Sequence, residues 1–304
     1  EQGGAMGESW SDLVASEYLF SHGYDQGAHP FVTGAYATGN KVTGIRNYAS
    51  NQNPLNYSNY GYDTTGAEVH ADGEIWNGTM WEVRQALVSR WESRYPYRDA
   101  KRQLDCAQGR GFVSPLRPQV CAGNRRWVQL MFDSFLVQAS GSVSMLDMRD
   151  AFLAADRVRF NDQNQKVIWD AFARRGMGEN AVSRGGDDTT VVGGFASPRS
   201  DNARITFDTE GSGNVYVGRF EARSRPVADT RRSTELSDRA SFTPGTYEML
   251  YVSPTRGAKR FSMTVRAGER RTVKVAAPVN VASAANGARV LRSTAGSLNV
   301  EDLI

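Results

Sequence analysis

Apolar residues recur with a helical period along the chain up to about residue 182. The clearest stretch runs over 68–94, where apolar side chains recur at steps of three, four or seven residues and form one stripe: Val69, Trp76, Met80, Val83 and Leu87. Shorter stretches with helical character predict further helices over 9–20, 127–139, 144–157 and 162–175. Ser144 and Asp147 are placed to form a capping box at the start of one of them.

After a Gly- and Asp-rich segment at 184–188, the apolar period changes from helical to alternating. Short runs place apolar residues at every second position, between turn signals such as Pro244-Gly245. These runs are Ile205/Phe207, Val215/Val217, Tyr247/Met249/Tyr251, Phe261/Met263/Val265 and Val273/Val275. The pattern predicts a helical domain over 1–182 and a small antiparallel β-sandwich over 183–281. Residues 282–304 are predicted to open a further, truncated module.

Charge and hydropathy exclude several classes of protein. The chain has 36 Lys and Arg against 33 Asp and Glu, a net charge of +3, without a basic run interleaved with aromatic residues. A nucleic-acid surface is therefore not expected. No apolar stretch approaches the roughly 20 residues of a membrane-spanning helix. The first residues show neither an initiator Met nor a signal-peptide core, and the last residues have no polar tail, so we expect a chain cut at both ends.

Two cysteines, Cys106 and Cys121, bracket a segment rich in glycine and proline. We predict a disulfide across this segment, which would stabilise the fold by on the order of 3 kcal/mol. Such a bond would place the protein outside the reducing cytosol. The alternative is a pair of unrelated buried thiols.

Glu8 and Asp12 are the first candidates for chemistry. Their spacing of four residues puts both carboxylates on one face of a helix, which is expected to begin just after a glycine-rich turn at residues 3–4. Like charges at this spacing repel each other, so the pair requires either solvent or a cation with its other ligands. The alternative is a solvated acidic helix start.

His70 is the second candidate, at the start of the helix predicted over 68–94. Histidine suits the donation of a hydrogen bond near neutral pH. The alternative is a partly buried histidine whose ring is satisfied by Glu74.

The motifs around these residues form a set. Residues 6–12 read M-G-E-S-W-S-D, residues 44–48 read G-I-R-N-Y and residues 68–76 read E-V-H-A-D-G-E-I-W. They resemble G-M-G-E-G-W-S-D, G-I-R-x-Y and V-H-A-x-G-E-x-W of the fungalysin family of secreted zinc metalloendopeptidases, with Ser9 in place of a family glycine. The resemblance implies a multidomain protein with the mainly α C-terminal lobe of a thermolysin-like fold. The all-β part that follows resembles the prealbumin-like sandwich of many secreted peptidases.

The resemblance also implies a role for each site residue. Glu8 matches the carboxylate zinc ligand that lies downstream of the H-E-x-x-H helix, and Asp12 matches the carboxylate that orients a zinc-bound histidine. His70 matches the histidine that hydrogen-bonds the oxyanion of the tetrahedral intermediate, and Arg46 the guanidinium that binds the carbonyl after the cleaved bond. In the complete site, one zinc ion polarises the scissile carbonyl and activates water, with the glutamate of H-E-x-x-H as general base.

The motif H-E-x-x-H occurs nowhere in the 304 residues, so this chain alone is not expected to cleave peptides. The implied partners are a protein or peptide substrate, an N-terminal catalytic lobe that carries H-E-x-x-H, and a propeptide. No calcium assignment follows from the sequence. We expect the protein to be secreted and extracellular. The competing hypothesis is a non-catalytic secreted binding or adhesion protein with a degenerate peptidase lobe.

Overall fold

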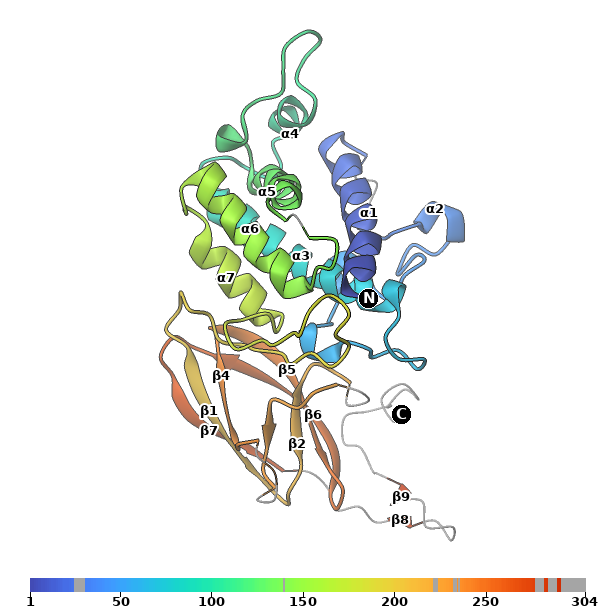
Figure 1. Ribbon diagram of the computed structural model, residues 1–304, viewed down its shortest axis with the longest axis vertical. Helices are drawn as coiled ribbons and strands as arrows, with labels where there is room; N and C mark the ends of the chain where they lie inside the picture. Colours follow the sequence, from blue (N-terminus) through green and yellow to red (C-terminus); the bar gives the residue numbers. More distant parts are fainter. Residues whose placement is uncertain are drawn as a thin grey trace.

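The computed structural model describes residues 1–24, 31–138, 140–220, 224–231, 234, 236–276, 282–283 and 289–290. The helices gather at one end of the molecule and the two larger sheets at the other (Figure 1). The helices are α1 Gln2–Ser21, α2 Ala35–Thr38, α3 Val69–Trp91, α4 Ala100–Ala107, α5 Gly123–Val137, α6 Met145–Phe160 and α7 Gln165–Arg174. Among these described helices, none combines the length and the apolar character needed to cross a bilayer.

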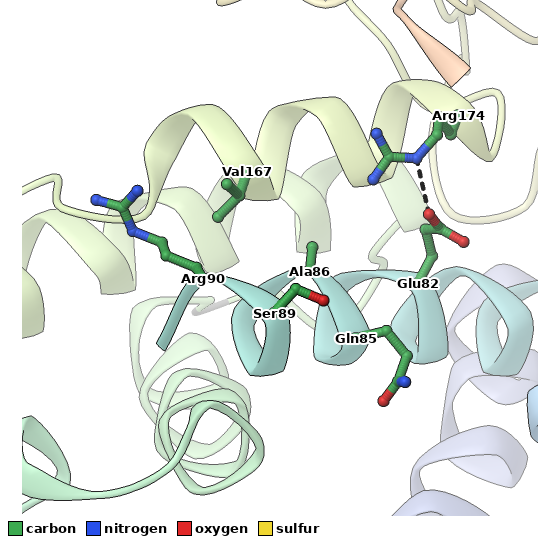
Figure 2. A pocket seen from close by; sticks show the side chains of 7 residues that line it. All are labelled: Glu82, Gln85, Ala86, Ser89, Arg90, Val167 and Arg174. Carbon is green, nitrogen blue, oxygen red and sulfur yellow. Dashed lines mark hydrogen bonds and ion pairs between the residues drawn. The ribbon is translucent and has the colours of Figure 1, made fainter. Parts of the chain in front are cut away.

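Helix α3 is the centre of the helical part, because α1, α5 and α7 all pack against it. The predicted apolar stripe faces these neighbours, and four of its five side chains are fully buried: Trp76, Met80, Val83 and Leu87. Between α3 and α7 lies a pocket that an ion pair closes at one end (Figure 2). There Nε of Arg174 donates to Oε1 of Glu82 at 2.7 Å.

Helix α1 begins at Gln2, so the glycine-rich turn expected at residues 3–4 is wrong. The glycines lie inside the helix because α1 and α3 cross closely. A Cβ on Gly4 would lie 3.0 Å from Cγ1 of Val69, and a Cβ on Gly73 would lie 2.8 Å from the carbonyl oxygen of Ala5. Packing of the two helices therefore offsets the low helix propensity of glycine.

This crossing can be tested with two alanine substitutions. Gly73→Ala should destabilise the protein by about 1–3 kcal/mol, because the new methyl group meets a backbone carbonyl, which cannot move aside as a side chain can. Gly7→Ala is the matched control, since an added Cβ there has no neighbour within 4 Å. It should be neutral or stabilise the helix by up to about 1 kcal/mol. Denaturant unfolding measures both changes, and equal effects would contradict the close-packing explanation.

The predicted disulfide is present. Cys106 and Cys121 are bonded, with their Cα atoms 6.1 Å apart, so the alternative of two separate thiols is wrong. The bond joins the end of α4 to the residue before the N-cap of α5. The sequence did not predict α4, which is only eight residues long. Asp99 caps this helix by accepting a hydrogen bond from the backbone N–H of Arg102 at 3.0 Å.

The predicted capping box of α6 is also confirmed. The hydroxyl of Ser144 accepts from the backbone N–H of Asp147 at 3.1 Å, and the Asp147 carboxylate accepts from the backbone N–H of Ser144 at 2.9 Å. Two backbone N–H groups that have no partner within the helix are therefore hydrogen-bonded, each by the side chain of the other residue.

The β part consists of two sheets with the orders β4-β1-β7 and β3-β2-β5-β6, and a separate β8-β9 pair. Apolar side chains from both larger sheets form one core, to which Phe207, Val215, Met249 and Met263 belong. The strands are β1 Ala203–Thr209, β2 Asn214–Val217, β3 Ala228–Asp229, β4 Arg239–Phe242, β5 Gly245–Ser253, β6 Gly257–Val265, β7 Arg270–Val275, β8 Ala282–Ser283 and β9 Arg289–Val290.

The prediction of a wholly antiparallel sandwich is wrong at one pair, because β7 runs parallel to β1. Strands β5 and β6 lie in the other sheet, so the chain returns to the first sheet across the core and not through a hairpin. Parallel neighbours require a crossover of this kind. The likeness to prealbumin stays a prediction.

The two parts of the chain touch at several points. Phe220 belongs to the helical core, and its ring lies 5.3 Å from that of Tyr62. The Gly- and Asp-rich segment at 184–188 holds the start of α1: the buried amide of Gln2 donates to the carbonyl oxygens of Gly185 and Asp188 at 3.3 and 2.9 Å. The domain limits at 182 and 281 stay predictions. Apart from β8 and β9, the predicted module over 282–304 lies outside the described residues.

Candidate active site

The predicted site residues Glu8, Asp12, Arg46 and His70 meet where α1 crosses the start of α3. Nη2 of Arg46 donates to Oε2 of Glu8 at 3.1 Å, and Nε of Arg46 donates to Oδ2 of Asp12 at 2.7 Å. Nε2 of His70 lies 3.5 Å from the same oxygen of Glu8. Residues from two helices and one loop therefore converge on a single carboxylate.

The positive charge of Arg46 offsets the repulsion between the two carboxylates. Its side chain is 12% exposed and that of Asp12 is 10% exposed, so their ion pair is largely shielded from water. Burial by itself would lower the pKa of Arg46, but the hydrogen bonds and charges of Asp12 and Glu8 outweigh it and the pKa is raised. A solvated acidic helix start is therefore the wrong description of Asp12. Glu8 remains partly exposed.

His70 is anchored by Glu68, a residue that the sequence did not single out. Nδ1 of His70 lies 2.6 Å from Oε1 of Glu68, whose other oxygen accepts from the backbone N–H groups of His70 and Ala71 at 2.9 Å each. Burial alone would raise the pKa of Glu68, but these N–H groups and the imidazole lower it to about 2. An acidic residue just before the first helical residue was the available signal, because the start of a helix favours negative charge.

Glu74 does not contact the His70 ring, so the alternative of a histidine satisfied by Glu74 is wrong. Its two oxygens instead accept from the backbone N–H groups of Asn47 and Tyr48, at 2.8 and 3.0 Å. These bonds fix the loop that carries Arg46 directly against α3. Burial raises the pKa of Glu74 to about 7, against the lowering effect of the two N–H groups.

This buried carboxylate predicts a pH dependence of stability. Because the folded-state pKa of Glu74 lies above its unfolded value, the folded protein binds more protons between about pH 4.5 and 7. Its contribution to stability is present below that window and is lost as the pH rises through it, with a slope of up to about 1.4 kcal/mol per pH unit. Glu74→Gln should remove this slope.

Chemical denaturation at several pH values measures the effect. The free energy of unfolding of Glu74→Gln, taken relative to the unmodified protein, should increase between about pH 4.5 and 7. Glu179→Gln, at an exposed position, controls for the loss of one carboxylate. A difference that stays constant with pH for Glu74→Gln would rule out the titration of Glu74 in this range.

Asp72 is a second buried carboxylate that the sequence did not single out. It accepts from the backbone N–H groups of Gly61 and Glu68 at 2.7 and 3.1 Å. Burial raises its pKa to about 7. It therefore ties the loop before α3 to the first turn of that helix, next to His70.

The described residues fit a zinc site only in part. Among them, no three His, Cys, Asp or Glu side chains are grouped as they would be around a metal ion. A catalytic zinc site needs three protein ligands, and carboxylate oxygen is one of the accepted donors. Oε1 of Glu8 has no hydrogen-bonding partner in the part of the chain that the structure describes. Glu8 therefore fits as one ligand of such a site, and its other protein ligands would have to come from outside these residues.

Comparison with known proteins decides the family. The model of the fungalysin metallopeptidase family (M36) matches residues 1–181, which include every residue of the site. The chain belongs to this family. The match ends close to residue 182, where the apolar period changes from helical to alternating, so the fungalysin relationship covers the helical part.

Fungal relatives support the same assignment. This fungalysin chain is 30% identical over 187 residues to extracellular metalloproteinase 4 of Trichophyton tonsurans, which covers 60% of this chain and 26% of that protein. It is 30% identical over 191 residues to extracellular metalloproteinase mep of Aspergillus terreus, with 61% and 27% covered. For extracellular metalloproteinase 4 of Trichophyton rubrum the identity is 28% over 187 residues. The chain thus spans about a quarter of the length of these relatives.

Proposed function

We propose that this fungalysin chain supplies one half of the active site of a secreted zinc endopeptidase, and that an upstream lobe with H-E-x-x-H supplies the other half. The observation that carries the proposal is the convergence of Arg46 and His70 on the carboxylate of Glu8, with contacts of 3.1 and 3.5 Å. A protein that only binds a partner has no chemical need for this combination. The extracellular relatives and the disulfide support secretion.

Glu8 would hold the metal through its unpaired Oε1, together with two histidines of the upstream lobe. The ion, when bound, supplies a Lewis acid for the scissile carbonyl. Helix α1 fixes the position of Glu8, because its backbone packs against Gly73 of α3 without an intervening side chain.

His70 would stabilise the negative charge that develops on the substrate carbonyl oxygen. Its side chain is 58% exposed, so a substrate can reach the ring, and Glu68 holds the ring through Nδ1. Because this hydrogen-bond donor is already oriented, little free energy is spent on reorganising it during the reaction. Glu68 acts through His70 in this scheme and does not itself touch the substrate.

Arg46 would bind a backbone carbonyl of the substrate. Nε and Nη2 are used by Asp12 and Glu8, whereas Nη1 has no partner among the described residues. The planar guanidinium is fixed by its contacts with two carboxylates, so its remaining N–H groups point in a defined direction. Asp12 thereby orients Arg46, and we retain for it the second role of orienting a zinc-bound histidine.

The test is to produce this chain in one polypeptide with the sequence that precedes it in its gene, and to measure zinc content and peptide hydrolysis. We expect one zinc per chain and hydrolysis that a chelator abolishes and zinc restores. The 304-residue chain alone is the control and should show neither. A correctly folded longer protein without zinc and without hydrolysis would favour the competing hypothesis of a secreted binding protein.

A further inference from the structure

The loop closed by the Cys106–Cys121 disulfide presents large apolar side chains to solvent. We call residues 106–121 the disulfide loop. Its residues 110–117 are all exposed. Phe112 and Val113 stand out, with relative exposures of 110% and 68%. An isolated exposed apolar residue needs no explanation, but a neighbouring aromatic and aliphatic pair at the tip of a projecting loop indicates a contact surface.

The tip of the disulfide loop forms a hydrogen-bonded turn although its exposed side chains pack against no core. Arg110 and Val113 exchange two backbone hydrogen bonds of 3.1 and 2.8 Å, which close a tight turn with Gly111 at φ 55°. A glycine with positive φ at this position is typical of a type II′ hairpin turn. Further back, the N–H of Leu116 donates to the carbonyl oxygen of Asp105 at 3.0 Å. Because the turn is already formed, little conformational entropy is lost when the tip binds.

The disulfide loop and the segment just before it carry an excess of positive charge. Residues 98–117 contain five Lys and Arg but only two Asp, while the whole chain has a net charge of only +3. The two acidic side chains are already paired, Asp99 with Arg102 and Asp105 with both Lys101 and Arg110. The remaining cations are exposed and, within the described residues, have no acidic partner: Arg98 and Arg117.

We propose that the disulfide loop docks on an anionic phospholipid surface. Phe112 and Val113 would enter the boundary between headgroups and acyl chains, while the cations behind them contact lipid phosphates. Figure 1 shows the loop between α4 and α5 projecting from the end of the molecule opposite the sheets, so a flat surface can reach it first. This proposal is independent of the proposed peptidase activity.

The geometry favours lipid over other partners. A stable protein interface covers about 800 Å² on each side, which a convex two-residue tip does not offer. A sulfated polysaccharide would bind the cations and leave Phe112 and Val113 in water. Of these partners, only the boundary between lipid headgroups and acyl chains accommodates both the apolar tip and the cations behind it. Long basic side chains reach the phosphates there, while apolar groups lie deeper.

Cosedimentation with vesicles tests the proposal on the 304-residue chain. We expect binding to phosphatidylcholine vesicles that contain 30% phosphatidylglycerol, weakening with added salt. Phe112→Ser should reduce the partition constant about tenfold, and Arg98→Gln and Arg117→Gln about fivefold each. Leu136→Ser is the matched control, because Leu136 of α5 is also 85% exposed, and it should bind like the unmodified protein. Circular dichroism and an intact disulfide by mass spectrometry establish that each variant is folded.

A label at the tip separates lipid insertion from simple charge attraction. Both native cysteines are in the disulfide, so Ser114→Cys can be labelled with an environment-sensitive dye, and Thr255→Cys in the β5–β6 turn serves as the distant control. A blue shift on anionic vesicles for residue 114 alone supports insertion. The proposal is overturned if the protein does not bind these vesicles at low salt, or if binding depends on the arginines but not on Phe112. A polysaccharide ligand would give the latter result, with heparin binding unaffected by Phe112→Ser.

Discussion

Glu8→Gln is expected to remove most of the zinc from the proposed complete enzyme and with it nearly all peptide hydrolysis. A neutral amide is a poor ligand for this dication, whereas the carboxylate offers an unpaired oxygen. The substitution preserves the shape of the side chain, and an amide oxygen still accepts the hydrogen bond from Arg46. Folding should therefore be retained, and the loss should appear in zinc stoichiometry measured on purified protein.

His70→Ala is the informative partner of this variant. Because the proposed role of His70 is to hydrogen-bond the oxyanion, its removal should leave zinc content unchanged while turnover falls roughly 10²- to 10³-fold. Asp12→Asn should reduce metal affinity or activity only about 10- to 100-fold. The three variants are compared by zinc content, peptide hydrolysis and unfolding in the same longer protein. Loss of zinc in His70→Ala, or full zinc occupancy in Glu8→Gln, would show that the proposed roles are wrong.

Arg84→Met is expected to destabilise the fold by about 3–5 kcal/mol, the largest effect on stability that we predict. Arg84 and Glu17 form an ion pair of 2.7 Å, and their side chains are only 1% and 2% exposed. Removing the arginine leaves the buried carboxylate of Glu17 without its cation, which is far more unfavourable than the loss of a surface pair. The guanidinium also lies about 5 Å from the rings of Phe31 and Trp81, and these contacts are lost too.

The double variant Glu17→Leu with Arg84→Met separates the two causes. If the unpaired charge dominates, the double variant should be more stable than Arg84→Met alone. Arg157→Met is the surface control, because its pair with Asp162 is well exposed, with side chains 67% and 46% accessible. It should change the free energy of unfolding by no more than about 0.5 kcal/mol. Similar losses for Arg84→Met and Arg157→Met would contradict this account.

Features that depend on neighbours in the sequence were predictable. The apolar stripe of α3, the capping box at Ser144 and the alternating strands β1, β2, β5, β6 and β7 all follow from periods of 3.6 or 2 residues and from local turn chemistry. The disulfide followed from two cysteines around an irregular segment. The site motifs also identified Glu8, Asp12, Arg46 and His70 as members of one family pattern, and the structure brings these residues together.

Features that depend on distant residues needed the tertiary structure. The start of α1 was predicted too late, because its glycines serve the contact with α3 and not a turn. The parallel pairing of β1 with β7 depends on strands that lie in the other sheet.

The same division holds inside the site. Sequence motifs placed a histidine and two carboxylates there, but only the fold shows that Arg46 lies between the carboxylates and that Glu68, and not Glu74, holds His70. The free energy of a buried charge or amide depends on every group packed around it, wherever that group lies in the chain. The sequence alone therefore determined which elements and which reactive groups are present. The tertiary structure decided which of these groups are paired, and so which of them remain free to act.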